Sequence, residues 1–210
     1  MTTPLRLGAL LSGGGRTVLN LADRIADGTL PADITLVIAS RADVAGVQRA
    51  RARGLEVRVA DRRDYESADR LHDTITSWLV ERDVQLVCLC GYLYWFRLDQ
   101  PFRGRAMNIH PALLPDFGGK GMYGLAVHRA VLASGAKVSG CTVHFLDDQY
   151  DHGPIILHRE CPVLPGDDEQ ALADRVFEQE CIAYPEAIGL FADRRLRLEG
   201  DQVKILSAPT

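Results

Sequence analysis

The chain has 210 residues, with 24 lysines and arginines against 28 aspartates and glutamates, so its formal charge is −4. Hydrophobic residues make up 47% and charged residues 25%, ordinary globular values that exclude a disordered or fibrous chain. A chain of this length buries enough surface to fold without a disulfide or a structural metal. The mild acidity, with no strongly basic region, argues against nucleic acid as the main partner.

The sequence also argues against a membrane or secreted protein. The longest apolar run, 86–96, is about half of the roughly 20 residues that a membrane span needs. The first residues lack the long apolar region of a signal peptide. The five cysteines are an odd number without a CxxC pair, which is typical of free thiols in a reducing compartment. We therefore expect a cytoplasmic monomer or homodimer whose partners are small-molecule substrates.

The first half alternates short apolar runs with helical patterns. Apolar runs bounded by turn residues predict strands at 5–11, 34–39, 55–59, 86–90 and 106–110. Apolar residues at helical spacing predict helices at 17–26, at 45–53 and from a Ser67 cap to residue 82. Such alternation favours a parallel sheet with helices on both faces.

The second half has a different character. A Pro/Gly-rich loop covers 111–124, followed by a helix at 127–133 and a strand at 141–146 paired with 154–159. A long helix at 168–193 contains Pro185, and the chain then shows a hairpin pattern at 196–198 and 203–205. We predict one α/β domain over residues 1–210 with a mostly parallel, Rossmann-like central sheet and an antiparallel C-terminal part. Its N-terminal half is expected to bind phosphate.

A glycine-rich turn joins the first strand to the first helix. The segment Ser12-Gly13-Gly14-Gly15-Arg16-Thr17 offers backbone amides and the positive end of a helix dipole, which suit a phosphate. It fits neither the dinucleotide fingerprint, because residue 18 is Val, nor the P-loop. A tight turn without a ligand stays an alternative. A basic cluster at Arg49, Arg51, Arg53, Arg62 and Arg63 is either a solvated surface or an anion contact.

Two polar segments are candidates for catalysis. Asn108 and His110 are two residues apart in a predicted strand that ends at Pro111, so both side chains project from one face. A carboxamide beside an imidazole suits oxyanion stabilisation and proton transfer, although a structural His and a capping Asn are an alternative. The second segment is the acidic turn 147–154.

Two other kinds of chemistry have weaker support. Zinc ligands could come from His110, His144 and His152 with Asp148 or Asp151, but no ligand spacing such as HExxH is present. A serine hydrolase would need a G-x-S-x-G elbow, which the chain lacks. We therefore expect no metal.

Four motifs together resemble the folate-dependent formyltransferases. They are Ser12-Gly13-x-Gly15, the run Asn108-Ile109-His110-Pro111-Ala112-Leu113-Leu114-Pro115, the segment Gly140-Cys141-Thr142-Val143-His144-Phe145, and Asp151-x-Gly153-Pro154-Ile155-Ile156. The likeness runs in order from about residue 5 to residue 198. It implies transfer of a formyl group from the co-substrate 10-formyltetrahydrofolate to the amine of glycinamide ribonucleotide, in de novo purine biosynthesis.

The resemblance also implies roles for individual residues. Asn108 would donate a hydrogen bond to the developing oxyanion, His110 would stabilise that oxygen and pass a proton to the folate nitrogen, and Asp151 would orient His110 and a water. The phosphate and ribose of the ribonucleotide would contact Gly13, Gly14, Gly15, Arg16, Thr17 and Glu180. The C-terminal half would bind folate, which would contact Tyr92, Leu93, Tyr94, Trp95, Phe96, His144 and Asp148. The alternatives are packing in the core for the aromatic run 94–96 and a solvent-facing helix position for Glu180.

Three departures from the family pattern leave the amine substrate open. Arg16-Thr17 stands where Ser or Thr followed by Asn is usual, 94–96 is aromatic where the family is aliphatic with an Arg, and the loop 116–124 is longer with four glycines. The alternatives are a formyltransferase for another amine, such as an amino sugar nucleotide, a formyltetrahydrofolate deformylase, and a non-catalytic folate-binding module.

Overall fold

The computed structural model describes residues 3–207. The chain divides into two compact units, Met1–Met107 and Asn108–Thr210. The strand β5 (Ala106–His110) begins at the end of the first unit and brings its last residues into the second. The single-domain organisation expected from the sequence stays a prediction.

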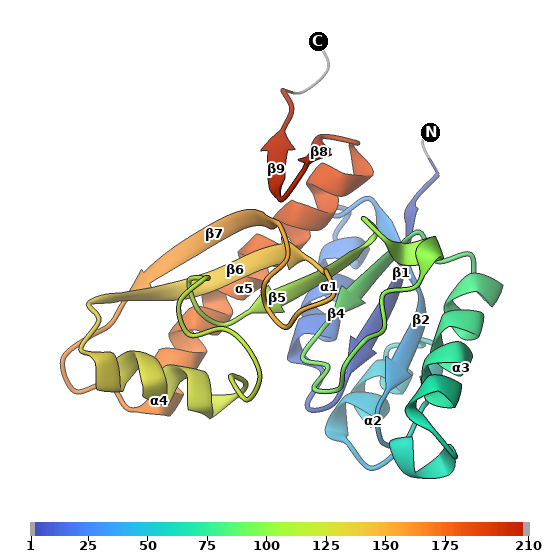
Figure 1. The fold of residues 1–210 in the computed structure, drawn as a ribbon, viewed down its shortest axis with the longest axis horizontal. Coiled ribbons are helices and arrows are strands. Elements are labelled where there is room, and N and C mark those ends of the chain that lie inside the picture. Colours follow the sequence, from blue (N-terminus) through green and yellow to red (C-terminus); the bar gives the residue numbers. More distant parts are fainter. Residues whose placement is uncertain (1–2, 208–210) are drawn as a thin grey trace. The chain divides into compact units, whose positions relative to one another are not determined.

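The first unit is an α/β arrangement built on parallel strands (Figure 1). Its strands lie in the order β3-β2-β1-β4, and each described pair among them is parallel. The strands are β1 (Leu5–Leu11), β2 (Ala32–Ala39), β3 (Val57–Val59) and β4 (Leu86–Leu89). The helices are α1 (Arg16–Ala26), α2 (Ala45–Ala52) and α3 (Ala68–Glu81), with short 3-10 turns at Arg62–Asp64 and Gln100–Phe102.

Helices cover both faces of these parallel strands. A Cβ placed on Gly8 of β1 would lie 2.5 Å from Leu79 of α3, so α3 packs on the face to which residue 8 points. A Cβ placed on Gly46 of α2 would lie 2.9 Å from a methyl of Leu11. Residues 8 and 11 point to opposite faces of β1 because side chains alternate along a strand. The helices on both faces that the sequence predicts are therefore confirmed within this unit.

The second unit pairs antiparallel strands with two helices. Its strand order is β5-β6-β7, and β6 (Val138–Phe145) is antiparallel to β7 (Ile155–Pro162). The remaining elements are α4 (Leu125–Ser134), α5 (Glu169–Ala192), and the antiparallel hairpin of β8 (Leu196–Glu199) and β9 (Gln202–Ile205). The predicted antiparallel C-terminal part is confirmed. The helix α5 runs through Pro185 as one element.

The bounds of β6 differ from the predicted strand at 141–146. The strand starts at Val138, so Gly140 lies inside it and pairs with Glu160 of β7. Glycine is usually a turn signal, but a Cβ at residue 140 would lie only 2.0 Å from the carbonyl oxygen of Arg159. The glycine therefore marks a close approach of two strands rather than a strand end. No helix within residues 3–207 is both long and apolar enough to cross a bilayer.

Candidate active site

The strand β5 places the two central side chains of the candidate site. Asn108 and His110 point to the same side of the strand because they are two residues apart. His110 is 3% exposed, whereas Asn108 is half-buried. Pro111 follows directly and ends the strand, so the pair lies at its carboxyl end. This arrangement is the one that the Asn-Ile-His-Pro motif predicts.

The turn between β6 and β7 brings Asp151 to this pair. Its backbone takes the left-handed conformation, with φ at 50°, and its side chain is 13% exposed. One carboxylate oxygen, Oδ1, accepts a hydrogen bond from Nδ2 of Asn108 at 3.2 Å. The other, Oδ2, lies 3.5 Å from Nδ1 of His110. The structure thus unites the three residues that the resemblance implies, although they are 43 positions apart in the sequence at the widest.

His144 of β6 is a fourth polar side chain of the group and contacts Asn108. Its Nδ1 lies 2.8 Å from the carbonyl oxygen of Phe145, which can only accept, so we assign the proton to Nδ1. Its Nε2 is then an acceptor and lies 3.3 Å from Nδ2 of Asn108. Both hydrogens of the Asn108 amide are therefore directed at acceptors, one at His144 and one at Asp151. This pattern determines which way the carboxamide points.

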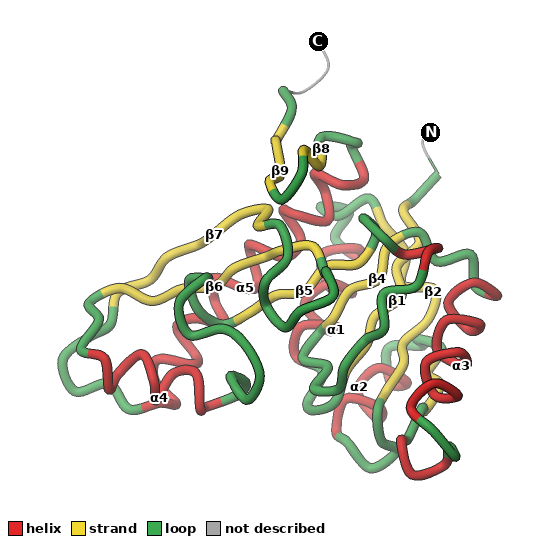
Figure 2. The backbone as a smooth tube through the Cα atoms, viewed as in Figure 1, coloured by secondary structure: helices red, strands yellow, loops and turns green. Residues whose placement is uncertain are grey.

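Backbone groups of the loop between β5 and α4 hold the other side of the site; Figure 2 shows this long loop in the second unit. The carbonyl oxygen of Phe117 lies 2.8 Å from Nε2 of His110. The backbone N–H of Gly119 donates to Oδ2 of Asp151 at 3.0 Å. Neither contact can be predicted from the sequence, because a backbone partner leaves no side-chain signal. The cluster of glycines in the loop was the available hint.

Thr142 anchors the start of the same loop. Its hydroxyl donates to the carbonyl oxygen of Ala112 at 2.6 Å and accepts from the N–H of Leu114 at 2.9 Å. The side chain is fully buried on β6. A buried hydroxyl that satisfies two backbone groups stabilises one conformation of the segment after His110. The motif containing Thr142 was noticed in the sequence, but this role was not.

The pKa values of His110 and Asp151 are both lowered, but by different causes. Burial lowers the pKa of His110, and this outweighs the nearby Asp151 carboxylate and the Phe117 carbonyl, which raise it. Burial by itself would raise the pKa of Asp151. The pKa nevertheless lies below its usual value, because positive charge on His144 or His110 and the N–H of Gly119 favour the ionised carboxylate. At neutral pH the site therefore holds a neutral imidazole beside a carboxylate anion.

The neutral His110 beside the Asp151 carboxylate can accept a proton, because the resulting positive charge would lie next to a negative one. A neutral His110 carries its proton on Nε2, because Phe117 can only accept there. Its Nδ1 then has a free lone pair facing Asp151. Protonation of Nδ1 would produce an imidazolium whose two N–H groups both face acceptors. The site is thus prepared for general acid–base chemistry.

The glycine-rich turn lies in the first unit, between β1 and α1. Gly15 caps α1 with φ at 73°, and Gly13, Gly14 and Arg16 are exposed while Thr17 is half-buried. Exposed amides at the start of an 11-residue helix can bind an anion. A hydrogen bond connects this turn to the loop that follows β4 in the same unit: the Ser12 hydroxyl accepts from the N–H of Leu93 at 3.0 Å.

Arg49 of α2 is a further cation at this turn. Its guanidinium donates to the carbonyl oxygen of Gly14 at 2.9 Å. Other members of the basic cluster have acidic partners: Arg63 pairs with Asp61 at 2.6 Å, and Arg53 pairs with Asp23. The sequence named the cluster without singling out Arg49. Only the folded first unit brings its side chain to the turn.

The aromatic segment predicted to contact folate divides into two groups. Tyr92 and Phe96 are buried and belong to the core of the first unit. The second group is accessible to solvent: Leu93 and Tyr94 are 51% and 40% exposed, and Trp95 is half-buried. The rings of Tyr92 and Tyr94 are 6.0 Å apart. The segment is therefore partly packing and partly available surface.

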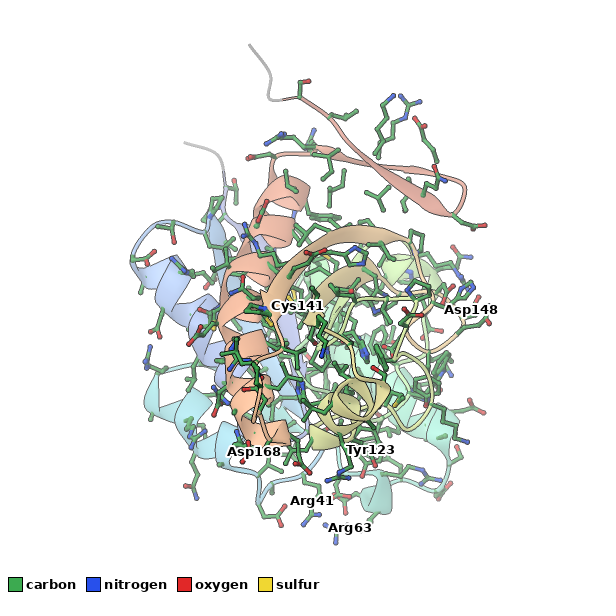
Figure 3. All side chains as sticks on the ribbon, turned by 90° about the vertical axis from the view of Figure 1, so that its left-hand side faces the viewer. Arg41, Arg63, Tyr123, Cys141, Asp148 and Asp168 are labelled. Carbon is green, nitrogen blue, oxygen red and sulfur yellow. The ribbon has the colours of Figure 1, made fainter. Side chains whose placement is uncertain are left out.

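The remaining predicted site residues lie in the second unit. Glu180 is on α5 and is close enough to Cys141 of β6 for its charge to help raise the pKa of that thiol; Figure 3 shows Cys141 beside this helix. Asp148 is exposed on the turn before β7, as Figure 3 also shows. His152 pairs with Asp147 at 2.6 Å, away from the buried group. Within residues 3–207 no group of three or more histidines, cysteines or acids is arranged to hold a metal ion.

Comparisons with known proteins identify relatives of this chain. Residues 5–188 match the family model for formyl transferase. The chain is 36% identical over 204 residues to the chloroplastic phosphoribosylglycinamide formyltransferase of Arabidopsis thaliana, covering 96% of this chain and 70% of that protein. It is 38% identical over 198 residues to the trifunctional purine biosynthetic protein adenosine-3 of Drosophila pseudoobscura pseudoobscura, covering 91% of this chain but 14% of that longer protein.

A solved structure extends the agreement to the fold. The crystal structure of glycinamide ribonucleotide transformylase 1 from Symbiobacterium toebii is 39% identical, with a TM-score of 0.91, and the match covers 99% of this chain and 96% of that one. The chain belongs to the formyl transferase family. The predicted α/β fold with a mostly parallel central sheet is confirmed by the same match.

Proposed function

We propose that the chain transfers the formyl group of 10-formyltetrahydrofolate to the amine of glycinamide ribonucleotide, a step of de novo purine biosynthesis. Family membership and the names of its relatives support formyl transfer to glycinamide ribonucleotide, and the family resemblance implies the folate as formyl donor. The observation that carries the proposal is the hydrogen-bonded group of Asn108, His110 and Asp151 at the end of β5. Such a group suits acyl transfer to an amine, because it combines a donor for an oxyanion with a proton acceptor.

The reaction has two bond changes and one net proton transfer. The lone pair of the substrate amine attacks the formyl carbon, and the formyl oxygen takes up negative charge in a tetrahedral intermediate. The carbon–nitrogen bond to the folate then breaks, and the folate nitrogen takes the proton that the attacking amine releases. Asn108 stabilises the oxyanion by giving it one amide hydrogen in exchange for its bond to His144 or Asp151. Each such donor is worth about 3–4 kcal/mol of transition-state stabilisation.

His110 carries the proton between the two nitrogens. Its neutral resting form can accept the proton from the attacking amine, and the resulting imidazolium is stabilised by Asp151 and the Phe117 carbonyl. It then donates the proton to the departing folate nitrogen. Asp151 remains ionised throughout and also orients a water in this relay. His144 keeps the amide of Asn108 correctly turned.

The remaining residues bind the two substrates. We assign the phosphate of the ribonucleotide to the amides of 13–17 with the charges of Arg16 and Arg49, and its ribose to Glu180. We assign the folate to the segment 92–96, with Leu93, Tyr94 and Trp95 as the accessible contacts, together with His144 and Asp148. No metal takes part in this scheme. The folate is a co-substrate rather than a resident cofactor.

The proposal is tested with purified protein and both substrates. Release of the deformylated folate is followed by absorbance, and the formylated amine is identified by mass spectrometry. Asn108→Ala should lower kcat by about a hundred-fold or more, in line with loss of an oxyanion donor. Absence of turnover by the folded protein would refute the proposal. Formate release without an amine would indicate a deformylase. Formylation of an amino sugar nucleotide alone would indicate a different formyltransferase, and folate binding without turnover would indicate a binding module.

A further inference from the structure

Two glycines in the loop after β5 lie against the catalytic group. Gly118 and Gly119 follow Phe117, whose carbonyl oxygen contacts His110, and the Gly119 N–H donates to Asp151. Three consecutive residues thus supply one contact to the imidazole and one to the carboxylate. The two side chains that they hold come from different elements, β5 and the turn before β7.

A side chain at residue 118 would require its neighbours to shift. A Cβ placed there would lie 2.5 Å from Cδ2 of Leu114 and 3.3 Å from Cβ of Asp151. Gly119 is different, since its Cβ would meet no described atom within 4 Å, but its φ of 98° disfavours any other residue. The first glycine therefore allows close approach to Leu114 and Asp151, and the second allows the backbone conformation.

Unusual backbone conformations occur on both sides of this contact. Phe117 has φ at 57° and Asp151 has φ at 50°, in a region that bulky residues rarely adopt. Each puts a polar group in position, the carbonyl oxygen of Phe117 toward His110 and the carboxylate of Asp151 toward Asn108 and Gly119. Such conformations persist where surrounding contacts determine them.

We infer that Gly118 and Gly119 are positioning residues for the reaction: they let the backbone of 117–119 hold His110 and Asp151 in their productive orientation. The inference rests on the proposed function. It assigns no contact with substrate to either glycine. It predicts that a methyl group at residue 118 displaces the backbone and breaks both contacts at once, because the Phe117 carbonyl and the Gly119 N–H flank that residue.

The pH dependence of kcat separates positioning from loss of folded protein. The groups whose charge acts on His110 are Asp151, His144 and, from α4, the buried His128. The Phe117 carbonyl raises the pKa of His110, so its loss should lower that pKa further. The acidic limb of the kcat profile should then move to lower pH. A smaller folded fraction would lower the amplitude and leave the limb where it is.

The experiment compares Gly118→Ala with Gly121→Ala. Gly121 lies in the same loop with φ at 92° and with no described atom within 4 Å of its Cβ, so its variant tests loop strain without the clash. Gly118→Ala should lower kcat at least tenfold, change each KM less than threefold, and shift the acidic limb, whereas Gly121→Ala should stay within threefold of the parent. The double variant Leu114→Val with Gly118→Ala removes the nearest clashing atom and should recover part of kcat.

The outcomes separate this inference from the proposed function. Activity of the unsubstituted protein tests the function by itself. Near-parental kcat in Gly118→Ala, or an equal loss in Gly121→Ala, would overturn the positioning role while leaving the function intact. A lower kcat with an unchanged acidic limb and no rescue by Leu114→Val would overturn it as well.

Discussion

Replacing Asp151 with Asn removes one charge from the centre of the site with little change in shape. In the native site the carboxylate accepts from Asn108 at 3.2 Å and from the Gly119 amide at 3.0 Å, and it lies 3.5 Å from Nδ1 of His110. The amide of Asn can still accept through its oxygen. It cannot accept both bonds, because its second terminal atom is an NH2 donor, so one of the two hydrogen bonds disappears together with the negative charge that stabilises a protonated His110.

The size of the effect follows from that separation. Two unit charges about 4 Å apart interact by about 4 kcal/mol at an effective dielectric constant near 20. Both side chains are largely buried, at 3% and 13% exposure for His110 and Asp151, so little solvent screens them. In Asp151→Asn, a transition state that carries half of the imidazolium charge loses about 2 kcal/mol of electrostatic stabilisation. A transition state that carries the full charge loses about 4 kcal/mol. The expected fall in kcat is therefore about thirty-fold to a thousand-fold.

The assay is the initial rate of folate release at saturating concentrations of both substrates. We expect each KM to stay within about threefold, because the charge acts on the transition state rather than on ground-state binding. Asp174→Asn, on α5 in the same unit, is the control for loss of one carboxylate and should leave kcat unchanged. A folded Asp151→Asn protein with kcat within fivefold of the parent would refute the electrostatic role.

Two further predictions concern protonation and anion binding. Burial lowers the pKa of His110, and the neutral form accepts the proton, so kcat should rise with pH to a plateau with a midpoint below 6.5. Asp151→Asn should move that midpoint to a still lower pH. A midpoint above 6.5 would contradict the role assigned to His110. Arg49→Gln should weaken binding of the ribonucleotide by about 1 kcal/mol and so raise its KM about five-fold, with kcat and the KM for folate unchanged. Steady-state titration of each substrate measures these constants. An unchanged KM for the ribonucleotide would show that Arg49 does not bind the phosphate.

Several local features were predictable because they depend on short stretches of sequence. The strands β1 and β5 have the predicted bounds, since each apolar run is closed by a residue that ends a strand, Ser12 with its glycines or Pro111. Ser67 caps α3 as predicted, accepting from the N–H of Arg70 at 3.2 Å. Side-chain alternation also put Asn108 and His110 on one face.

Other features depend on approach between distant segments and carry weak signals. The start of β6 was missed because Gly140 resembles a turn residue until β7 lies against it. The contacts of Phe117 and Gly119 use backbone atoms, which every residue has. Arg49 was one of several arginines until the first unit brought it to Gly14. No local pattern distinguishes these cases.

The amino-acid sequence alone predicts the kinds of groups in the candidate site: a carboxamide and an imidazole on one strand, an acidic turn, and a glycine turn suited to an anion. It does so through periodicity and residue type, which are properties of the chain. The tertiary structure decided their protonation and orientation. Burial makes His110 neutral, Asp151 is kept ionised by its neighbours, and Asn108 is turned by His144. The physical reason is that solvent exclusion and hydrogen-bond partners exist only once β5, β6 and the two loops of the second unit have packed together.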